Sequence, residues 1–183
     1  MDTLEPTALS DRFDDVETLE EFLSRPSRAL IDDMKRLDGD VLILGVGGKM
    51  GPTLARLAKR AAPEKRIVGV ARFSQTDLRD RLEGQGIETI ACDLLDREVV
   101  VDLPRLRNVV FMAGRKFGST GAEELTWAMN AWVPTIVAET FTDSRGGPLR
   151  RRASDRLGDR CRADGSADFQ DRRPHRRHRS GHV

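Results

Sequence analysis

Three glycines, Gly45, Gly48 and Gly51, have a type and spacing that can hold a phosphate group. They follow the apolar run Val41–Leu44, which is typical of a strand buried on both faces. Glycine here allows a tight turn, a close approach of the backbone to a pyrophosphate, and close packing of a helix on the strand. A helix from about Pro52 would present free N–H groups to the phosphates. The run predicts a dinucleotide phosphate site, and a plain glycine-rich turn in a parallel sheet is the alternative.

The elements that must position this turn follow from the spacing of apolar residues. Residues 54–61 carry leucine and alanine at helical intervals, and Pro63 closes that segment. Residues 67–71 are apolar again and are typical of a second buried strand. Together with the first strand they predict a strand–helix–strand unit of about 30 residues, the context in which a glycine turn binds a dinucleotide.

The same alternation continues along the chain. Further helices are predicted at 77–83, 99–103 and 123–141, and further strands at 87–91 and 108–113. Alternating strands and helices predict an α/β fold. We expect a doubly wound parallel sheet of about four strands in the order 3-2-1-4, with right-handed crossovers.

Three parts are predicted: an N-terminal helical extension over 1–38, the incomplete sheet domain over 39–144, and an arginine-rich tail over 145–183. The extension is expected to form two short helices separated by Pro26, with Thr18 and Ser27 as N-terminal caps, that pack on the sheet or on a partner. The tail carries 12 Arg and 5 Asp but no Lys or Glu. Because it contains few large apolar side chains, we expect it to be disordered.

Composition excludes several classes of protein. No apolar stretch approaches the roughly 18 residues of a membrane helix, and the first residues lack the pattern of a signal peptide, so we expect a cytoplasmic protein without membrane contact. The two cysteines, Cys92 and Cys161, have no disulfide or metal-ligand spacing, and Cys92 is interpreted as a small core residue.

The net charge of +1 is unevenly distributed along the chain. The first 144 residues carry 19 Lys and Arg against 25 Asp and Glu, so they are acidic, whereas the tail, with 12 Arg and 5 Asp, is basic.

The tail has a second interpretation, in which its arginines contact nucleic-acid phosphates by non-specific electrostatics. Only Phe169 lies among them, so base stacking is not supported and a nucleic-acid partner is disfavoured. His175, His178 and His182 also lie there, without Cys or carboxylate ligands at a fixed spacing. No metal site is therefore predicted.

Residues 39–141 resemble the cofactor-binding part of the short-chain dehydrogenase/reductase superfamily, in its extended, epimerase/dehydratase-like branch. The turn Gly45–Gly51 matches the G-x-x-G-x-x-G pattern of that branch. Cys92–Leu94 is similar to the segment with an acidic residue that holds the adenine after strand three. Met112–Gly114 resembles the small-residue turn near the nicotinamide ribose, and Asn130 lies where the family's fourth helix carries an asparagine. The resemblance implies a Rossmann-like NAD(P)-binding domain.

The turn and the resemblance together predict the residues that contact the cofactor. They are Gly45, Gly48, Lys49, Met50, Gly51, Arg72, Asp93, Leu94, Ala113 and Gly114. Two of the residues named above have alternative interpretations. Asp93 could cap the next short helix, and Asn130 could be an exposed polar residue. Trp127 and Trp132 are interpreted as packing residues. Pro134 removes a helix hydrogen bond, which predicts a kink.

The choice between NAD and NADP depends on the end of the second strand. An acidic residue there would bind the ribose 2′-hydroxyl of NAD, whereas this chain has Ala71-Arg72-Phe73-Ser74. The guanidinium of Arg72 and the hydroxyl of Ser74 suit a 2′-phosphate, which favours NADP. If Arg72 lies only over the adenine ring, NAD fits as well.

The chemistry of the resembled family is not complete in these residues. It needs a Tyr general acid/base with a Lys four residues later, but the chain has no tyrosine and no lysine after Lys116, so no catalytic residue is assigned. Polar residues after Ser144 stand where a fifth strand should lie, and we expect strand four to be an unpaired apolar edge. Our hypothesis is a break of the reading frame near 143–147. It would give a truncated, inactive product that aggregates or forms a homo-oligomer through this edge.

The sequence thus predicts the NAD(P)-binding domain of an epimerase/dehydratase-like oxidoreductase, and the resemblance implies a sugar nucleotide or a similar compound as the substrate class. Two alternatives stay open. One is a non-catalytic NAD(P)-binding regulator or partner subunit, and the other is a nucleic-acid-associated protein that uses the tail. The residues decide neither the substrate nor whether this chain is itself an enzyme.

Overall fold

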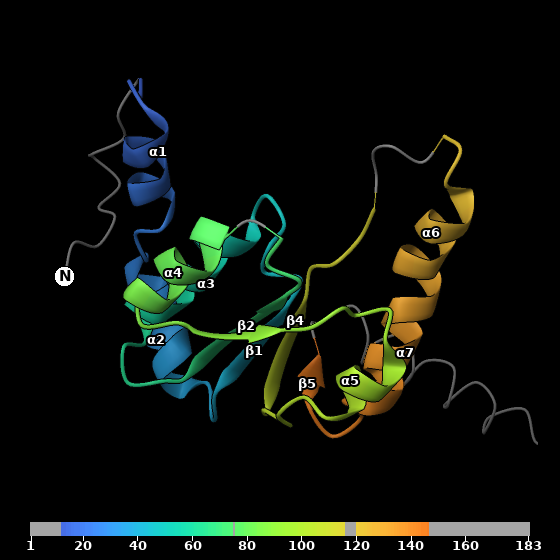
Figure 1. Cartoon of the computed structure of the whole chain (residues 1–183). Helices are drawn as coiled ribbons and strands as arrows, with labels where there is room; N and C mark the ends of the chain where they lie inside the picture. The colour runs from blue at the N-terminus through green and yellow to red at the C-terminus, as the bar shows by residue number, and fades with distance from the viewer. Residues whose placement is uncertain (1–11, 75, 116–119, 147–183) are drawn as a thin grey trace, which may run out of the picture. The chain divides into compact units, whose positions relative to one another are not determined.

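A parallel sheet with helices on both faces organises the described residues (Figure 1). The computed structural model describes residues 12–74, 76–115 and 120–146. Its strands are β1 (Val41–Leu44), β2 (Ile67–Ala71), β3 (Glu88–Ala91), β4 (Asn108–Phe111) and β5 (Arg145–Gly146). All neighbours pair in parallel, in the order β3-β2-β1-β4-β5. The predicted α/β fold and the strand order 3-2-1-4 are therefore confirmed.

The helices divide between the two faces of the sheet. They are α1 (Val16–Leu23), α2 (Arg28–Arg36), α3 (Gly51–Ala61), α4 (Thr76–Gly84), α5 (Arg97–Val101), α6 (Glu123–Trp127), the π-helix η1 (Ala128–Trp132) and α7 (Val133–Thr140). Figure 1 shows α2, α3 and α4 on one face, and α5 and α7 on the other. None of the described helices is long and apolar enough to cross a membrane.

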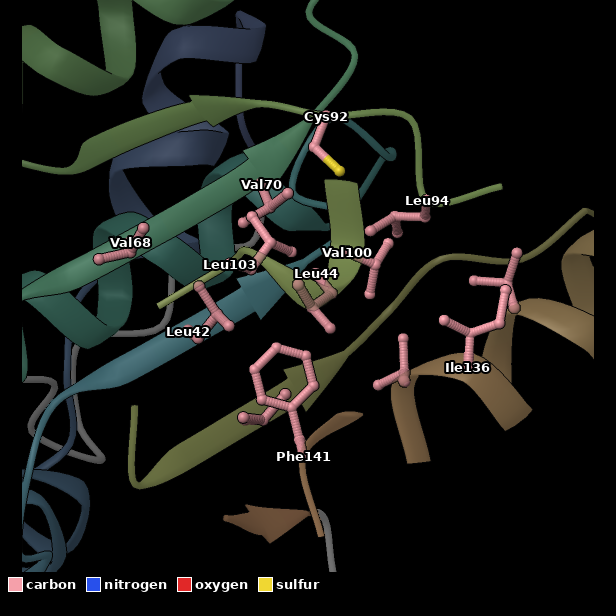
Figure 2. Packing of buried hydrophobic residues seen from close by; sticks show 13 residues of the cluster. Leu42, Leu44, Val68, Val70, Cys92, Leu94, Val100, Leu103, Ile136 and Phe141 are labelled. Carbon is pink, nitrogen blue, oxygen red and sulfur yellow. The ribbon is translucent and has the colours of Figure 1, made fainter. Parts of the chain in front are cut away.

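The side chains of β1 alternate between two hydrophobic clusters, one on each face. Leu42 and Leu44 belong to the cluster that includes Ile136 of α7 and Phe141 just after it (Figure 2). Val41 and Ile43 point the other way, into the cluster formed with α2, α3 and α4. This double burial explains why the strand is an uninterrupted apolar run in the sequence.

The N-terminal helices confirm one predicted cap and correct the other. Ser27 caps α2, where its hydroxyl accepts a hydrogen bond from the Leu30 N–H at 3.2 Å. Helix α1 is capped by Asp15, whose carboxylate accepts from the Thr18 N–H at 2.6 Å, so the prediction of Thr18 as the cap was wrong. The backbone of Asp15 is extended, which lets its carboxylate accept a hydrogen bond from one of the free N–H groups of the first turn. Asp is as effective as Ser at this position.

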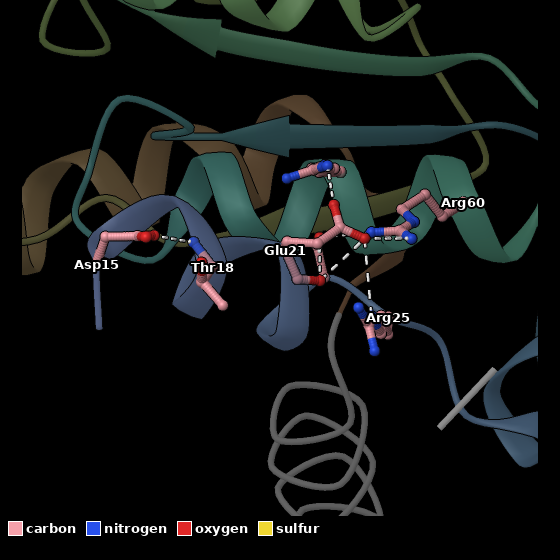
Figure 3. A network of polar contacts seen from close by, with 7 residues as sticks. Asp15, Thr18, Glu21, Arg25 and Arg60 are labelled. Carbon is pink, nitrogen blue, oxygen red and sulfur yellow. Dashed lines mark hydrogen bonds and ion pairs between the residues drawn. The ribbon is translucent and has the colours of Figure 1, made fainter. Parts of the chain in front are cut away.

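A carboxylate surrounded by three arginines joins α1 to α3. Glu21 of α1 forms ion pairs with Arg56 and with Arg60 of α3, the second at 2.8 Å, and Arg25 lies 3.7 Å from it (Figure 3). Arg60 also donates to the hydroxyl of the buried Ser24 at 3.0 Å. The hydrogen bond from Arg60 and the positive charges around it hold the pKa of Glu21 below its usual range.

The helix predicted over 123–141 is present but is not uniformly α-helical. Between α6 and α7 it widens into η1, where the Val133 N–H donates to the Ala128 carbonyl five residues earlier. Pro134 has no N–H with which to close an α-helical bond to the carbonyl of Asn130. The predicted disturbance at Pro134 thus takes the form of a π turn in front of the proline.

The expected unpaired edge of β4 is corrected at two positions. Asn108 and Val109 pair with β5, which lies at residues that the sequence assigned to the tail. The Arg145 N–H donates to the Arg107 carbonyl at 2.6 Å, and the Ser144 hydroxyl donates to the Leu106 carbonyl at 2.7 Å. Because such pairing uses main-chain groups, a polar segment can add to a sheet without an apolar pattern to reveal it.

Several predictions fall on residues 1–11 and 147–183, outside the described residues. They include the disorder of the tail, its contacts with nucleic acid, and the absence of a metal site at its histidines. The boundaries at residues 38 and 144 remain predictions. Within the described residues, no group of three or more His, Cys, Asp or Glu side chains could hold a metal ion.

Candidate dinucleotide site

A cavity of about 350 Å³ lies at the carboxyl ends of β1, β2, β3 and β4. The turns that follow these four strands line it, together with Leu125 of α6 and Met129 of η1. From β1 the sheet continues through β2 on one side and β4 on the other, so the cavity lies at the point where the strand order reverses. Open α/β sheets bind ligands at such switch points.

The turn after β1 has a shape that only glycine at two positions allows. Gly45 has a φ of +90°, and a Cβ there would lie 2.6 Å from the main-chain nitrogen of Ala113. A Cβ on Gly51 would lie 2.1 Å from the Val46 carbonyl oxygen. These glycines are required by the close approach of β1 to β4 and by the entry into α3, whatever the cavity binds.

Gly48 differs from these two, because no close packing requires it to be glycine. A Cβ on Gly48 would meet only the Gly45 carbonyl oxygen, at an ordinary contact distance of 3.4 Å. Gly48 lines the cavity, and so does Gly47 beside it. Helix α3 begins directly after this turn, and its first residue is preceded by Met50, which makes no side-chain cap. The turn therefore offers a wall without side chains and a helix N-terminus without a side-chain cap, the features that suit a phosphate.

The structure brings together seven of the ten residues predicted to contact a cofactor. Those that line the cavity are Gly45, Gly48, Arg72, Asp93, Leu94, Ala113 and Gly114. Lys49 and Met50 do not line it and are exposed, and Gly51 is buried beneath Val46. The contact of each residue with a cofactor remains a prediction.

The segment after β2 lies at one end of the cavity. Arg72, Phe73 and Ser74 all line it, and the side chains of Arg72 and Ser74 are exposed. Phe73 has a φ of +48°, a left-handed conformation that is uncommon for a residue other than glycine. This conformation turns the chain sharply between the arginine and the serine, and both remain at the cavity wall.

The segment after β3 settles two interpretations from the sequence. Asp93 does not cap α5, because that cap is Asp96; the Asp93 carboxylate instead accepts from the Leu95 N–H at 3.1 Å. Cys92 is buried, as predicted for a small core residue, and its burial raises the pKa of the thiol.

The loop after β4 is fixed by a side chain from η1. The Asn130 amide accepts from the Arg115 N–H at 2.8 Å and donates to the Arg115 carbonyl at 2.7 Å. A Cβ on Gly114 would lie 3.3 Å from the Asn130 side-chain oxygen. Although Asn130 is exposed, it therefore holds both main-chain groups of a residue at the cavity wall.

Sequence reasoning missed the helical wall of the cavity. Leu125 and Met129 are four residues apart and line the cavity from one side of the α6–η1 helix. This spacing is a signal that could have found them. Trp127 and Trp132 do not pack in the core: they are 73% and 51% exposed, so their interpretation as packing residues was wrong.

Parts of several solved structures are similar to this chain. The epimerase Mth375 of Methanothermobacter thermautotrophicus is 23% identical, over 62% of this chain and 34% of that chain, with a TM-score of 0.50. A ketoreductase from the first module of phoslactomycin biosynthesis in Streptomyces sp. HK803 is 28% identical over 58% and 30%, with a TM-score of 0.45. The UDP-glucuronic acid 4-epimerase of Bacillus cereus, in complex with NAD, is 19% identical over 55% and 35%, with a TM-score of 0.42.

The chain spans about a third of the length of these solved proteins. No family model matches it, and no curated protein matches it. The likeness to Mth375 shows an α/β, Rossmann-like fold, in agreement with the strand order and the helices on both faces.

Proposed function

We propose that the cavity binds a nicotinamide dinucleotide and that this chain is the NAD(P)-binding part of an epimerase/dehydratase-like oxidoreductase. One observation carries the proposal: Gly47 and Gly48 form a wall without side chains at the switch point of the sheet, directly before the N-terminus of α3. The pyrophosphate would lie against this wall and accept hydrogen bonds from main-chain N–H groups. Because packing within the protein does not require glycine at position 48, space for a ligand is a reason for glycine there, which supports the proposal.

The ends of the other strands would hold the two halves of the ligand. Arg72 and Ser74 would bind a 2′-phosphate on the adenosine ribose, which makes NADP the preferred ligand over NAD. Asp93 and Leu94 would contact the adenine, and the turn at Ala113 and Gly114 would lie beside the nicotinamide ribose. When bound, the nicotinamide supplies a site that accepts or donates a hydride.

The chain is proposed to bind the cofactor without turning over a substrate by itself. Its 183 residues contain no tyrosine, and the mechanism implied by the resemblance uses a tyrosine as general acid/base. Two proposed roles are compatible with the absence of tyrosine. The chain is either the cofactor-binding part of a longer oxidoreductase that acts on a sugar nucleotide or a similar compound, or a non-catalytic NAD(P)-binding subunit.

A calorimetric titration of the chain with NADP⁺, NADPH, NAD⁺ and NADH tests the proposal. Gly48→Glu places a carboxylate in the phosphate turn, so we expect affinity to fall at least tenfold. Gly84→Glu is the matched control, because a side chain at Gly84 meets no atom within 4 Å and Gly84 does not line the cavity. Equal affinities for these two variants and the unchanged chain, or no binding of any dinucleotide, would contradict the proposal.

A second variant separates the two cofactors. Arg72→Gln removes the charge proposed to hold the 2′-phosphate, so we expect weaker binding of NADP⁺ with little change for NAD⁺. An equal loss for both would place Arg72 over the adenine ring instead and remove the preference for NADP.

A further inference from the structure

The helix formed by α6 and η1 has two opposed faces. Leu125 and Met129 line the cavity on one of them. Trp127 lies two residues from each, which places it on the opposite side of the helix, and it is 73% exposed. Trp132 is 51% exposed on the same helix. One exposed hydrophobic residue needs no explanation, but two indoles on one helix form a patch of the kind that marks an interaction surface.

The π turn brings the two tryptophan positions toward one side of the helix. Trp127 and Trp132 are five residues apart, a spacing that puts side chains on different sides of an α-helix. Trp127 lies directly before η1, and Trp132 is its last residue. In η1 a main-chain hydrogen bond joins residues five apart, Val133 and Ala128. Residues separated by five therefore point in more similar directions here than in a regular α-helix, which places Trp127 and Trp132 on the same general side.

The segment that carries the two rings is acidic in sequence. Residues 120–144 contain Glu123, Glu124, Glu139 and Asp143 but no Lys, Arg or His. Glu123 and Glu124 lie four and three residues before Trp127, so they share its face, and both are exposed. The Glu123 carboxylate also accepts a hydrogen bond from the Gly121 N–H at 3.0 Å. Glu139 is engaged elsewhere, in an ion pair with Arg97 of α5 at 2.8 Å.

We propose that this tryptophan face, formed by Glu123, Glu124, Trp127 and Trp132, docks an arginine-rich segment of a partner polypeptide. A guanidinium group stacks on an indole ring and pairs with a carboxylate at the same time, which a lysine ammonium does less well. Face-to-face docking of a second copy would oppose like charges, which disfavours that arrangement. The 12 arginines of residues 145–183 have the same chemistry as the proposed partner, so binding of the added peptide is measured in competition with them. The proposal is independent of dinucleotide binding, because the face lies opposite to the cavity.

The composition of the chain gives a direct measurement. Its tryptophan emission comes from Trp127 and Trp132 alone, without overlap from tyrosine, because it has two tryptophans and no tyrosine. Titration of the full chain at low salt with a synthetic peptide of alternating Arg and Gly should change that emission, and calorimetry should give the affinity. A peptide of Lys and Gly should bind more weakly. Trp127→Ala and Trp132→Ala should each weaken binding roughly three- to tenfold.

A charge-matched pair of variants tests whether the contact is local. Glu124→Gln should weaken binding, whereas Asp32→Asn, at an exposed position on α2, should leave it unchanged. Equal losses of peptide affinity in the two variants would mean that binding depends only on overall charge, which would overturn the proposal. A peptide that neither binds nor changes the emission would overturn it as well. Self-association that Trp127→Ala abolishes would assign the face to a second copy and also overturn it. Binding of NADP⁺ should not change in Trp127→Ala, so the two proposals fail separately.

Discussion

On one side of β1 the sheet continues through β2 and β3, and on the other through β4 and β5. The first side pairs over four residues at each step, with α3 and α4 between consecutive strands. The second side begins with four pairs between β1 and β4 but ends with two pairs to β5. The first side supplies the glycine turn and Arg72, and the second supplies a wall fixed from η1. Local strand–helix–strand units thus build one half of the site, and contacts between distant segments build the other.

The largest expected effect comes from breaking the contact that joins the two sides. In Gly45→Ala the new methyl group meets the Ala113 main chain, and the φ of +90° strains an alanine. Because strain and overpacking add, we expect a loss of about 4 kcal/mol in the free energy of unfolding, measured by chemical denaturation. Gly84→Ala, with open space around it, should cause no loss. Similar midpoints for the two variants would show that the turn after β1 tolerates a side chain.

A matched pair of truncations tests whether the two sides unfold together. Ile136 of α7 and Leu82 of α4 are both buried, so each change to alanine should cost roughly 3 kcal/mol. Because Ile136 packs in the same cluster as Leu42 and Leu44, we expect one cooperative transition for both variants. A separate early transition in Ile136→Ala, seen by circular dichroism during denaturation, would mean that the β4 side unfolds on its own.

The wall beside β4 should loosen when its fixing residue is removed. Asn130→Ala loses two hydrogen bonds to Arg115, at an exposed position, so we expect about 1 kcal/mol of destabilisation and weaker binding of NADP⁺. Asn130→Asp keeps the acceptor but loses the donor, and it should fall between Asn130→Ala and the unchanged chain. Binding equal to that of the unchanged chain in both variants would limit Asn130 to a structural role.

The smallest effect is expected at the far end of the β2 side, where α1 is attached to α3. The pKa of Glu21 is below its usual range, so its ion pairs stabilise the fold above about pH 4.3 and are lost as the pH falls through the lower, folded-state pKa. Because Glu21 is partly exposed, we expect less than about 1 kcal/mol. Glu21→Gln should remove this part of the dependence of unfolding on pH between 7 and about 3. An identical pH profile in the variant would assign the acid sensitivity to other carboxylates.

Sequence patterns predicted the β2 side accurately because its elements pack on their neighbours in the chain. The strands at 41–44 and 67–71 lie at the predicted residues, and the helix between them packs on both. The glycine turn was visible because its backbone shape requires glycine at positions 45 and 51.

The β4 side was harder to predict for three physical reasons. Strand β5 adds through main-chain groups, which leave no apolar pattern. The partner of Asn130 is a main-chain amide 15 residues away, and no side-chain type reveals it. The π turn changes the direction of Trp132 relative to Trp127, and helical periodicity assumes a regular α-helix.

The contact between Gly45 and Ala113 also limits how this fold can be recombined. The turns after β1 and β4 are nearly 70 residues apart in the chain, yet any atom added at position 45 enters the space of the other turn. A chimera with its crossover between these positions would take the turn after β1 from one parent protein and the turn after β4 from the other. It would fold only if the two turns approach each other equally closely in both parents. The two turns therefore have to come from the same parent. Among folded products of recombination, crossovers outside residues 45–113 should be far more frequent than crossovers inside them.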